Sequence, residues 1–339
     1  HIYDVAAAKT QKIDLSNYAD FYIARLKWTN DQNILSAQII NRHQDNLDVL
    51  FVDGNSGSKK VILNEKDKAY VDITDNLTFL KDNSFIWTSE KDGFNHIYYY
   101  DKTGKLKNQV TKGNWDVTAY YGFDEKNKTI YYQSVENGSI NRDVYSISID
   151  GKAKKRLSLK TGTNNATFSP NFQYFINTYS SATAAPYYSL NDSKTTQEIK
   201  KIQSNEAVEE KLAKYNVAPK EFSTITTEKG HVLNTWMIKP KDFDATKKYP
   251  VFMFQYSGPG SQQVDNAWNG TDDYWFMMLA QKGYIVACVD GRGTGFKGAE
   301  FKKCTQKELG KYEVEDQIDA AKVFGKYTFV DKSRIGIFG

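Results

Sequence analysis

Tyr256 is the residue in this sequence whose type and setting most clearly suggest chemistry. It lies in "QYSGPGSQQ" (255–263), after the continuous apolar run "YPVFMFQY" (249–256). Such a run predicts a central parallel strand, and ligands bind at the carboxyl ends of these strands. Gly258, Pro259 and Gly260 predict a sharp turn that holds the phenol at the sheet edge, where it can donate a hydrogen bond. The alternative is one more packed tyrosine among 23, and the sequence leaves both interpretations open.

A second stretch, "VDGRGTGFKG" (289–298), is glycine-rich and directly follows the apolar strand "YIVACVD" (284–290). A dinucleotide-binding loop would need G-x-G-x-x-G, but counting from Gly291 and Gly293 the third position is Phe296. No clean amphipathic helix begins at these glycines, so their amides would have no helix dipole to join. The stretch therefore predicts a turn-rich connecting loop.

The third stretch is "SRIGIFG" (333–339), a short apolar strand that runs into Gly339. In α/β-hydrolases such a strand leads into G-x-S-x-G, a tight turn that lifts a nucleophilic serine out of the sheet. Gly339 stands where the first glycine of that motif would be.

Metal and cofactor chemistry is not indicated. The four histidines have no Cys or His partner at metal-ligand spacing, so no metal site or cofactor is predicted. His96 is expected to be a strand histidine with backbone partners. Cys288 and Cys304 could form a disulfide or remain free thiols. The net charge of +4 comes without a basic stripe, which does not suggest nucleic acid. The sequence has no run of about 18 apolar residues, so it predicts no membrane-spanning helix.

The elements ahead of these stretches form a repeat. An apolar strand, an Asp-led turn rich in Gly, Ser, Thr or Lys, and a second strand recur, with the turn aspartates at Asp4, Asp53, Asp101, Asp150 and Asp192. Further strands lie between them, which gives four strands per unit of roughly 40–50 residues, as in β-propeller blades. Residues 1–195 are thus predicted to be about four blades. Because Asp4 already falls inside a blade, earlier blades are expected to precede it.

The pattern changes near residue 195. Residues 196–220 predict a linker helix, with Val208, Leu212 and Tyr215 at helical spacing. Residues 221–339 follow as a hairpin and then β-α-β-α-β, which implies a mostly parallel sheet covered by helices. In the second helix, one face is predicted to contain Val314, Ile318, Ala321 and Phe324. The predicted fold class is multi-domain β plus α/β: the C-terminal portion of a β-propeller, then the N-terminal portion of an α/β-hydrolase domain.

Several blocks in this order carry a family likeness: "GNWDVTAYYG", "KYPVFMFQYSGPGSQQV", "VDGRGTGFKG", "YEVEDQIDAAKVF" and "DKSRIGIFG". Together they resemble the dipeptidyl peptidase IV branch of the prolyl oligopeptidase family, in its Bacteroidetes-type form. The resemblance implies an eight-bladed propeller joined to an α/β-hydrolase domain. It also implies a serine peptidase that releases N-terminal dipeptides with Pro or Ala in the second position. By the same resemblance, Tyr256 matches the tyrosine whose hydroxyl stabilises the oxyanion.

The resemblance also implies what these residues do not supply. The family's nucleophile lies in a Gly-Trp-Ser-Tyr-Gly-Gly turn whose first residue would be Gly339, so all three triad residues are expected after it. The paired glutamates that bind the substrate amine belong to an early blade, expected before His1. The chain alone is therefore expected to be inactive. A periplasmic or cell-envelope location and a homodimer are further expectations. An oligopeptidase, an acylaminoacyl peptidase and a non-catalytic propeller binding module remain as alternatives.

Overall fold

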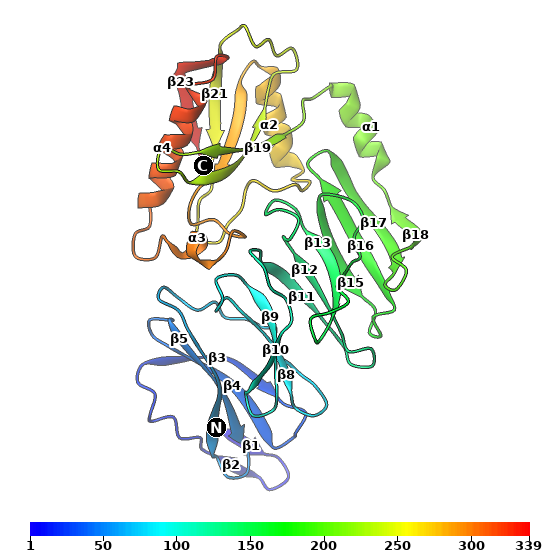
Figure 1. Ribbon diagram of the computed structural model, residues 1–339, viewed down its shortest axis with the longest axis vertical. Coiled ribbons are helices and arrows are strands. Elements are labelled where there is room, and N and C mark those ends of the chain that lie inside the picture. The colour runs from blue at the N-terminus through cyan, green and yellow to red at the C-terminus, as the bar shows by residue number, and fades with distance from the viewer. The chain divides into compact units, whose positions relative to one another are not determined.

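Each of the five Asp-led turns joins two antiparallel strands in the computed structural model, which describes residues 1–339 (Figure 1). In every turn the aspartate carboxylate accepts hydrogen bonds from backbone N–H groups two to four residues later, as at Asp53, which accepts from Asn55 and Ser56. Such Asx turns are local, which is why the sequence alone could predict them.

Four of the turns join the last two strands of a four-stranded antiparallel sheet, and these four sheets support the propeller prediction. A two-stranded hairpin, β1 (Ile2–Asp4) with β2 (Lys9–Gln11), precedes them. The sixteen strands are β3 (Phe21–Trp28), β4 (Ile34–Asn41), β5 (Asn46–Asp53), β6 (Lys59–Lys66), β7 (Thr78–Phe79), β8 (Phe85–Ser89), β9 (His96–Tyr100), β10 (Leu106–Gln109), β11 (Val117–Asp124), β12 (Thr129–Ser134), β13 (Asp143–Ser148), β14 (Lys155–Arg156), β15 (Thr163–Phe168), β16 (Tyr174–Ser181), β17 (Ala184–Asp192) and β18 (Glu198–Gln203).

Buried aromatic residues form much of the core of these sheets. Phe85 and Tyr100 stack with their ring centroids 5.1 Å apart, and Tyr131 stacks on Phe172 at 4.8 Å. His96 is fully buried in β9, where its ring nitrogens contact Thr111 Oγ1 at 3.0 Å and the carbonyl of Gly113 at 2.9 Å. Each ring nitrogen of this strand histidine thus has a hydrogen-bond partner, and one of the two partners is a backbone carbonyl.

The chain divides into two compact units. One comprises residues 1–113, 125–130 and 147–154, and the other comprises residues 114–124, 131–146 and 155–339. All three stretches singled out for chemistry lie in the second unit.

The fourth sheet extends past residue 195, which corrects the predicted start of the linker. β18 pairs with β17 and occupies residues 198–203, so the linker helix α1 is confined to Glu206–Tyr215. Every residue of β18 is exposed, and no residue of α1 is buried. An outer strand with so little buried surface has no apolar alternation to distinguish it from a linker.

The C-terminal region is built on one five-stranded sheet with the order β19-β20-β22-β21-β23. Its strands are β19 (Glu221–Thr226), β20 (Val232–Ile238), β21 (Tyr249–Phe254), β22 (Ile285–Asp290) and β23 (Val330–Phe338). The hairpin β19–β20 and the pair β20–β22 are antiparallel, whereas β22, β21 and β23 run parallel. The sheet is therefore mixed, with its parallel part where the β-α-β pattern predicted it.

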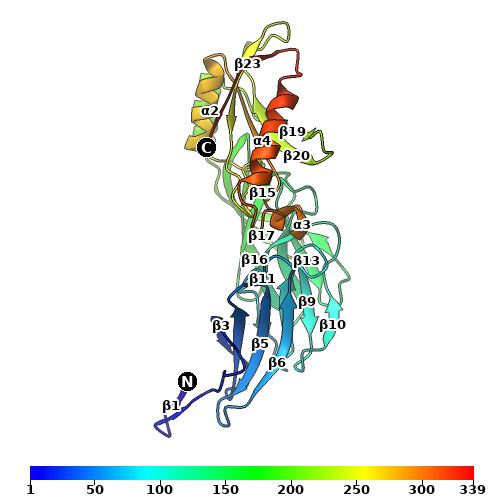
Figure 2. The same cartoon turned by 90° about the vertical axis from the view of Figure 1, so that its left-hand side faces the viewer.

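Helices cover both faces of this sheet. α2 (Thr271–Gln281) packs Phe276, Met277 and Ala280 on one face, and α4 (Lys311–Phe324) packs Ala320 and Phe324 on the other (Figure 2). The short helix α3 (Ala299–Lys303) lies between β22 and α4 in the chain. Cys288 is buried in β22, and both cysteines are free.

The buried face of α4 differs from the prediction. Val314 and Ile318 are 54% and 52% exposed, whereas Asp316 and Gln317 are buried together with Ala320 and Phe324. The two polar side chains turn inward because each has a partner at or just after the end of β22: Asp316 binds Arg292, and Gln317 donates to the carbonyl of Val289. Apolar periodicity cannot detect a helix face that is buried through polar pairing.

Candidate functional site

The carboxyl ends of β21 and β23 lie side by side and bring the predicted site residue Tyr256 near Gly339, the predicted first glycine of the turn motif. Phe254 pairs with Phe338, and the next N–H, of Gln255, donates to the carbonyl of Phe338 at 2.9 Å. Tyr256 and Gly339 therefore follow adjoining strand ends. A side chain at position 339 would overlap the carbonyl oxygen of Gln255, so glycine is needed at this close approach.

Tyr256 presents its side chain at this edge. The residue is 59% exposed, and its ring lies against Gly258, where an added Cβ would be only 3.3 Å from Cε1. The predicted sharp turn is present, since Ser261 N–H donates to the carbonyl of Gly258 at 2.9 Å. Ser261 Oγ also donates to the carbonyl of Tyr256 at 3.2 Å. An accessible phenol on such a turn can donate a hydrogen bond to an oxygen that becomes negatively charged.

The glycine-rich stretch after β22 packs backbone to backbone against the Tyr256 loop. Gly260 N–H donates to the carbonyl of Gly293, and Gly295 N–H donates to the carbonyl of Ser261, both at 2.8 Å. An added Cβ at Gly295 would lie 2.7 Å from the carbonyl oxygen of Gly260. The glycines thus permit two loops to approach closely. The stretch is therefore a connecting loop, as the sequence predicted. Its partner, the Tyr256 loop, was not predicted from the sequence.

Arg292 fixes the glycine-rich stretch to α4. Its guanidinium donates to both oxygens of the buried Asp316, from Nη2 to Oδ1 at 2.8 Å and from Nε to Oδ1 and Oδ2 at 3.1 and 3.0 Å. Its backbone N–H donates to the same carboxylate at 2.6 Å. Nη2 also reaches Glu315, and the guanidinium lies over the ring of Tyr312. The hydrogen bonds to Asp316 raise the pKa of Arg292. A paired, planar cation of this kind holds geometry as well as charge.

Asp290, the last residue of β22, holds the far end of the Tyr256 loop. Its buried carboxylate accepts the N–H of Val264 at 2.9 Å and the N–H of Gln263 at 3.0 and 3.2 Å to its two oxygens. Burial raises the pKa of Asp290 to about 6, although the backbone hydrogen bonds oppose that rise. The carboxylate is therefore mostly ionised at neutral pH and acts as an acceptor for two peptide groups.

The segment that precedes β13 contacts the same loops from the propeller portion of the second unit. Arg142 donates to Gln262 Oε1 at 2.5 Å and to the carbonyls of Ser139 and Asn141, and its guanidinium lies 4.1 Å from the ring centre of Phe296. Burial lowers the pKa of Arg142 to about 10, so it stays charged at neutral pH. Gln262 in turn donates to the carbonyl of Ser139 at 2.8 Å.

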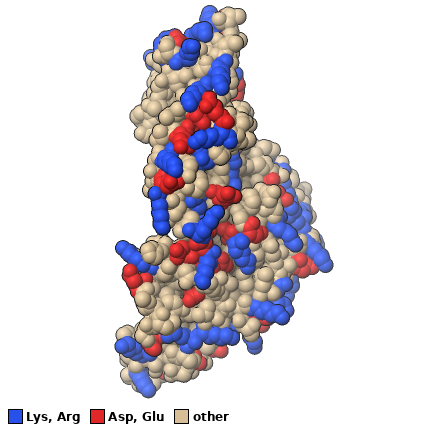
Figure 3. All heavy atoms as spheres, turned by 60° about the vertical axis from the view of Figure 1, so that its left-hand side comes forward, with Lys and Arg blue, Asp and Glu red and all other residues tan.

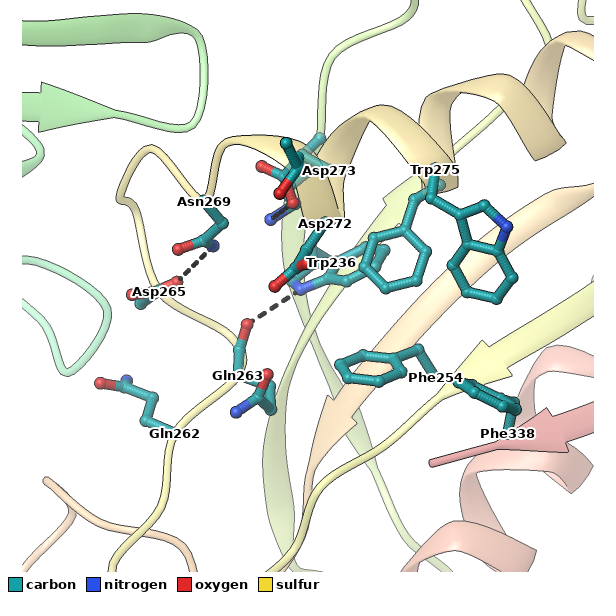
Figure 4. Close-up of a pocket in the computed structure, with 13 residues that line it drawn as sticks. Trp236, Phe254, Gln262, Gln263, Asp265, Asn269, Asp272, Asp273, Trp275 and Phe338 are labelled. Carbon is teal, nitrogen blue, oxygen red and sulfur yellow. Dashed lines mark hydrogen bonds and ion pairs between the residues drawn. The ribbon is translucent and has the colours of Figure 1, made fainter.

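A cavity of about 490 Å³ lies beside the loop, between the ends of β21 and β23 and the start of α2 (Figure 4). Its walls are aromatic at Phe254, Phe338 and Trp275, and polar around Asp272 and Asp273. The figure shows the Trp236 indole directed at the carbonyl of Gln263, to which it donates at 3.0 Å. Tyr256 does not line this cavity. Lys220 and Asp273, which form a buried ion pair at 2.6 Å, also line the cavity.

Charged side chains give little indication of a further ligand. Lys and Arg are intermingled with Asp and Glu on the face shown in Figure 3. The structure contains no group of three or more His, Cys, Asp or Glu side chains that could hold a metal ion. None of its helices combines the length and the apolar character that crossing a membrane requires.

Tyr256 and Gly339 were singled out from the sequence, but the side chains that contact the loop after Tyr256 and the glycine-rich stretch beside it were not. Asp290, Arg292, Asp316 and Arg142 were not predicted as site residues. The first two belong to "VDGRGTG" and the third to "YEVEDQ", so the quoted blocks contained the signal. Arg292 and Asp316 pair although they lie 24 residues apart, and no local pattern in the sequence reveals such a pair.

Comparison with family models gives two matches. Residues 1–186 match "Dipeptidyl peptidase IV (DPP IV) N-terminal region", and residues 271–339 match "Prolyl oligopeptidase family". The two matched ranges contain, respectively, most of the propeller portion and the part of the C-terminal region from α2 to Gly339.

Individual relatives agree with these matches. The chain is 32% identical to dipeptidyl peptidase 4 of Trichophyton equinum and 33% identical to that of Trichophyton rubrum, each across the whole of this chain and 45% of the relative. The crystal structure of Porphyromonas gingivalis dipeptidyl peptidase 4 is 45% identical, with a TM-score of 0.93 over 99% of this chain and 47% of that one. The chain thus spans about half the length of the relatives it matches.

Proposed function

Because the chain belongs to the dipeptidyl peptidase IV branch of the prolyl oligopeptidase family, we propose that the whole protein is a serine peptidase. It releases dipeptides from peptide N-termini that have Pro or Ala in the second position. The observation that carries this proposal is the juxtaposition of Tyr256 and Gly339 at adjoining strand ends. A strand that ends in glycine at this edge suits the turn that presents a nucleophilic serine.

In the proposed reaction, Tyr256 is the oxyanion donor. Attack by serine on the scissile carbonyl moves negative charge onto its oxygen, and a donor that is already aimed there stabilises the transition state more than the substrate. The phenol has few rotamers, and its turn is held by Gly258 and Ser261. Tyr256 thus supplies a fixed hydrogen bond without proton transfer.

The test is Tyr256→Phe in the full-length protein. We expect kcat to fall by roughly 10²-fold with little change in stability, since loss of one oxyanion donor has an effect of this size. Tyr284→Phe is the matched control, because Tyr284 is also exposed but precedes β22 at the opposite end of the strand. An unchanged kcat for Tyr256→Phe would remove Tyr256 from the mechanism.

Substrate class is tested separately with chromogenic Gly-Pro and Ala-Pro dipeptides that have a free N-terminus, against N-acetylated and internal peptide substrates. Release of the dipeptides supports the proposed activity. Turnover of only the N-acetylated or internal substrates would identify an acylaminoacyl peptidase or an oligopeptidase instead. No turnover of any of them would favour a non-catalytic binding module.

We also propose a periplasmic or cell-envelope location and a homodimer. Both rest on the resemblance to Bacteroidetes-type members of this branch. Fractionation of the producing cells tests the location, and light scattering during gel filtration of the full-length protein tests the assembly. Recovery in the cytoplasm, or a monomer at micromolar concentration, would contradict the respective proposal.

A further inference from the structure

Asp290 is a buried carboxylate whose hydrogen-bond partners all belong to one loop. It is 3% exposed and accepts only from the peptide N–H groups of Gln263 and Val264. No Lys, Arg or His forms an ion pair with it, although Lys297 favours its charge and Asp265 opposes it. Burying a carboxylate is costly unless donors compensate for the lost water. Here the donors are the backbone of the loop that begins at Tyr256.

The loop is held at two places along its length. Near its middle, Gly260 and Ser261 exchange hydrogen bonds with Gly293 and Gly295. At its end, Asp290 binds the N–H groups of residues 263 and 264, and the carbonyl of Gln263 accepts from Trp236. The attachments through Asp290, Gly293 and Gly295 originate from the end of β22 or the residues directly after it. The end of β22 and the residues after it therefore help to set the position of the loop that carries Tyr256.

We propose that Asp290 is a positioning residue that keeps the Tyr256 hydroxyl aimed at the oxyanion through the backbone of residues 263 and 264. This inference rests on the proposed function of Tyr256. Asp290 itself does not touch the reacting atoms. Its carboxylate presents two acceptor oxygens to two donors, and an amide in its place would set an N–H₂ group against one of those donors.

A double-mutant cycle tests the proposal in the full-length protein, with Asp290→Asn, Tyr256→Phe and the combination, assayed on a chromogenic Gly-Pro substrate. We expect Asp290→Asn to lower kcat about 10-fold with KM changed less than about 2-fold, because only transition-state stabilisation is lost. In the Tyr256→Phe background the same substitution should change kcat less than about 2-fold, since the hydroxyl it positions is gone.

The controls separate positioning from general stability. Asp143 is another buried carboxylate, which lies in β13 and binds Arg156 and Ser158. Its replacement in Asp143→Asn should leave kcat unchanged. If Asp290→Asn does not fold, Gly295→Ala displaces the same loop, because the new Cβ would lie 2.7 Å from the carbonyl oxygen of Gly260. It should show the same loss of kcat and the same dependence on Tyr256.

The outcomes distinguish the two hypotheses. If Tyr256→Phe lowers kcat but the effect of Asp290→Asn is absent, or multiplies with it independently, the positioning role is wrong and the proposed function stands. If Tyr256→Phe leaves kcat unchanged, the proposed role of Tyr256 is wrong, and the inference about Asp290 is overturned with it.

Discussion

At the scale of single residues, Gly258 is the contact that limits where the Tyr256 ring can lie. The ring packs over the glycine, and the position of an absent Cβ is 3.3 Å from Cε1 and 3.5 Å from the hydroxyl oxygen. These distances are at the close limit of ordinary contacts, so a methyl group there would press on the ring. Gly258 does not have a positive φ, so alanine is compatible with its backbone and the effect would be on the ring alone.

We expect Gly258→Ala in the full-length protein to lower kcat about 10-fold while the melting temperature changes little, because a small displacement of a catalytic group is enough to lose rate. Steady-state kinetics on a Gly-Pro substrate and a thermal melt of the same preparation provide the measurement. The double variant with Tyr256→Phe should be no slower than Tyr256→Phe alone. A full rate for Gly258→Ala would mean that the ring can move without consequence.

At the scale of elements, local sequence patterns predicted the features that depend on contacts between residues close together in the chain. The Asx turns at Asp53 and Asp101 depend on residues two to four positions away, so the blades could be read from the sequence. The inward face of α4 could not, because Asp316 is buried only through Arg292, which lies 24 residues earlier. For the same reason the contact of Asp290 with the N–H groups of Gln263 and Val264 was not predicted, although Asp290 belongs to one of the quoted blocks.

Arg142 makes one of the contacts between the segment preceding β13 and the loop after β21. Replacing it with Met would leave Gln262 Oε1 and the carbonyl of Asn141 without their donor, and would remove one of the two donors to the carbonyl of Ser139. It would also remove the cation over Phe296. Unpaired polar groups of this kind typically cost about 1–3 kcal/mol, so we expect Arg142→Met to lower the unfolding free energy by about 2 kcal/mol.

Denaturant unfolding measures this change, with Arg334→Ala as the control. Arg334 is more than half exposed and pairs with Asp331 three residues earlier, so its loss should cost less than about 1 kcal/mol. Equal effects of the two substitutions would show that the contact of Arg142 with the loop contributes no more than a surface pair.

At the scale of the whole molecule, seven tyrosines have pKa values that are raised mainly by burial. They are Tyr18, Tyr98, Tyr100, Tyr121, Tyr131, Tyr132 and Tyr145. All seven lie in the propeller portion, and for Tyr121 the pKa rises to about 12. A pKa that is higher in the folded state means that the neutral phenol is favoured by folding. This contribution is complete below about pH 10, the unfolded value, and is lost as the pH rises through the folded values.

We therefore expect an alkaline titration in which the folded protein forms fewer tyrosinates at about pH 11 than the same chain in concentrated guanidinium chloride, where tyrosines titrate near pH 10. The ultraviolet absorbance of tyrosinate measures the difference, and circular dichroism of the same samples reports the sheets. The missing tyrosinates should appear together with loss of the sheet signal, because ionising the buried phenols removes the stability that their neutral forms provide. Tyr132 is fully buried, so Tyr132→Phe should reduce by one the number of tyrosinates that form only when the sheets are lost. Coincident titration of the folded and unfolded chains, with the sheets intact, would contradict the burial of these side chains.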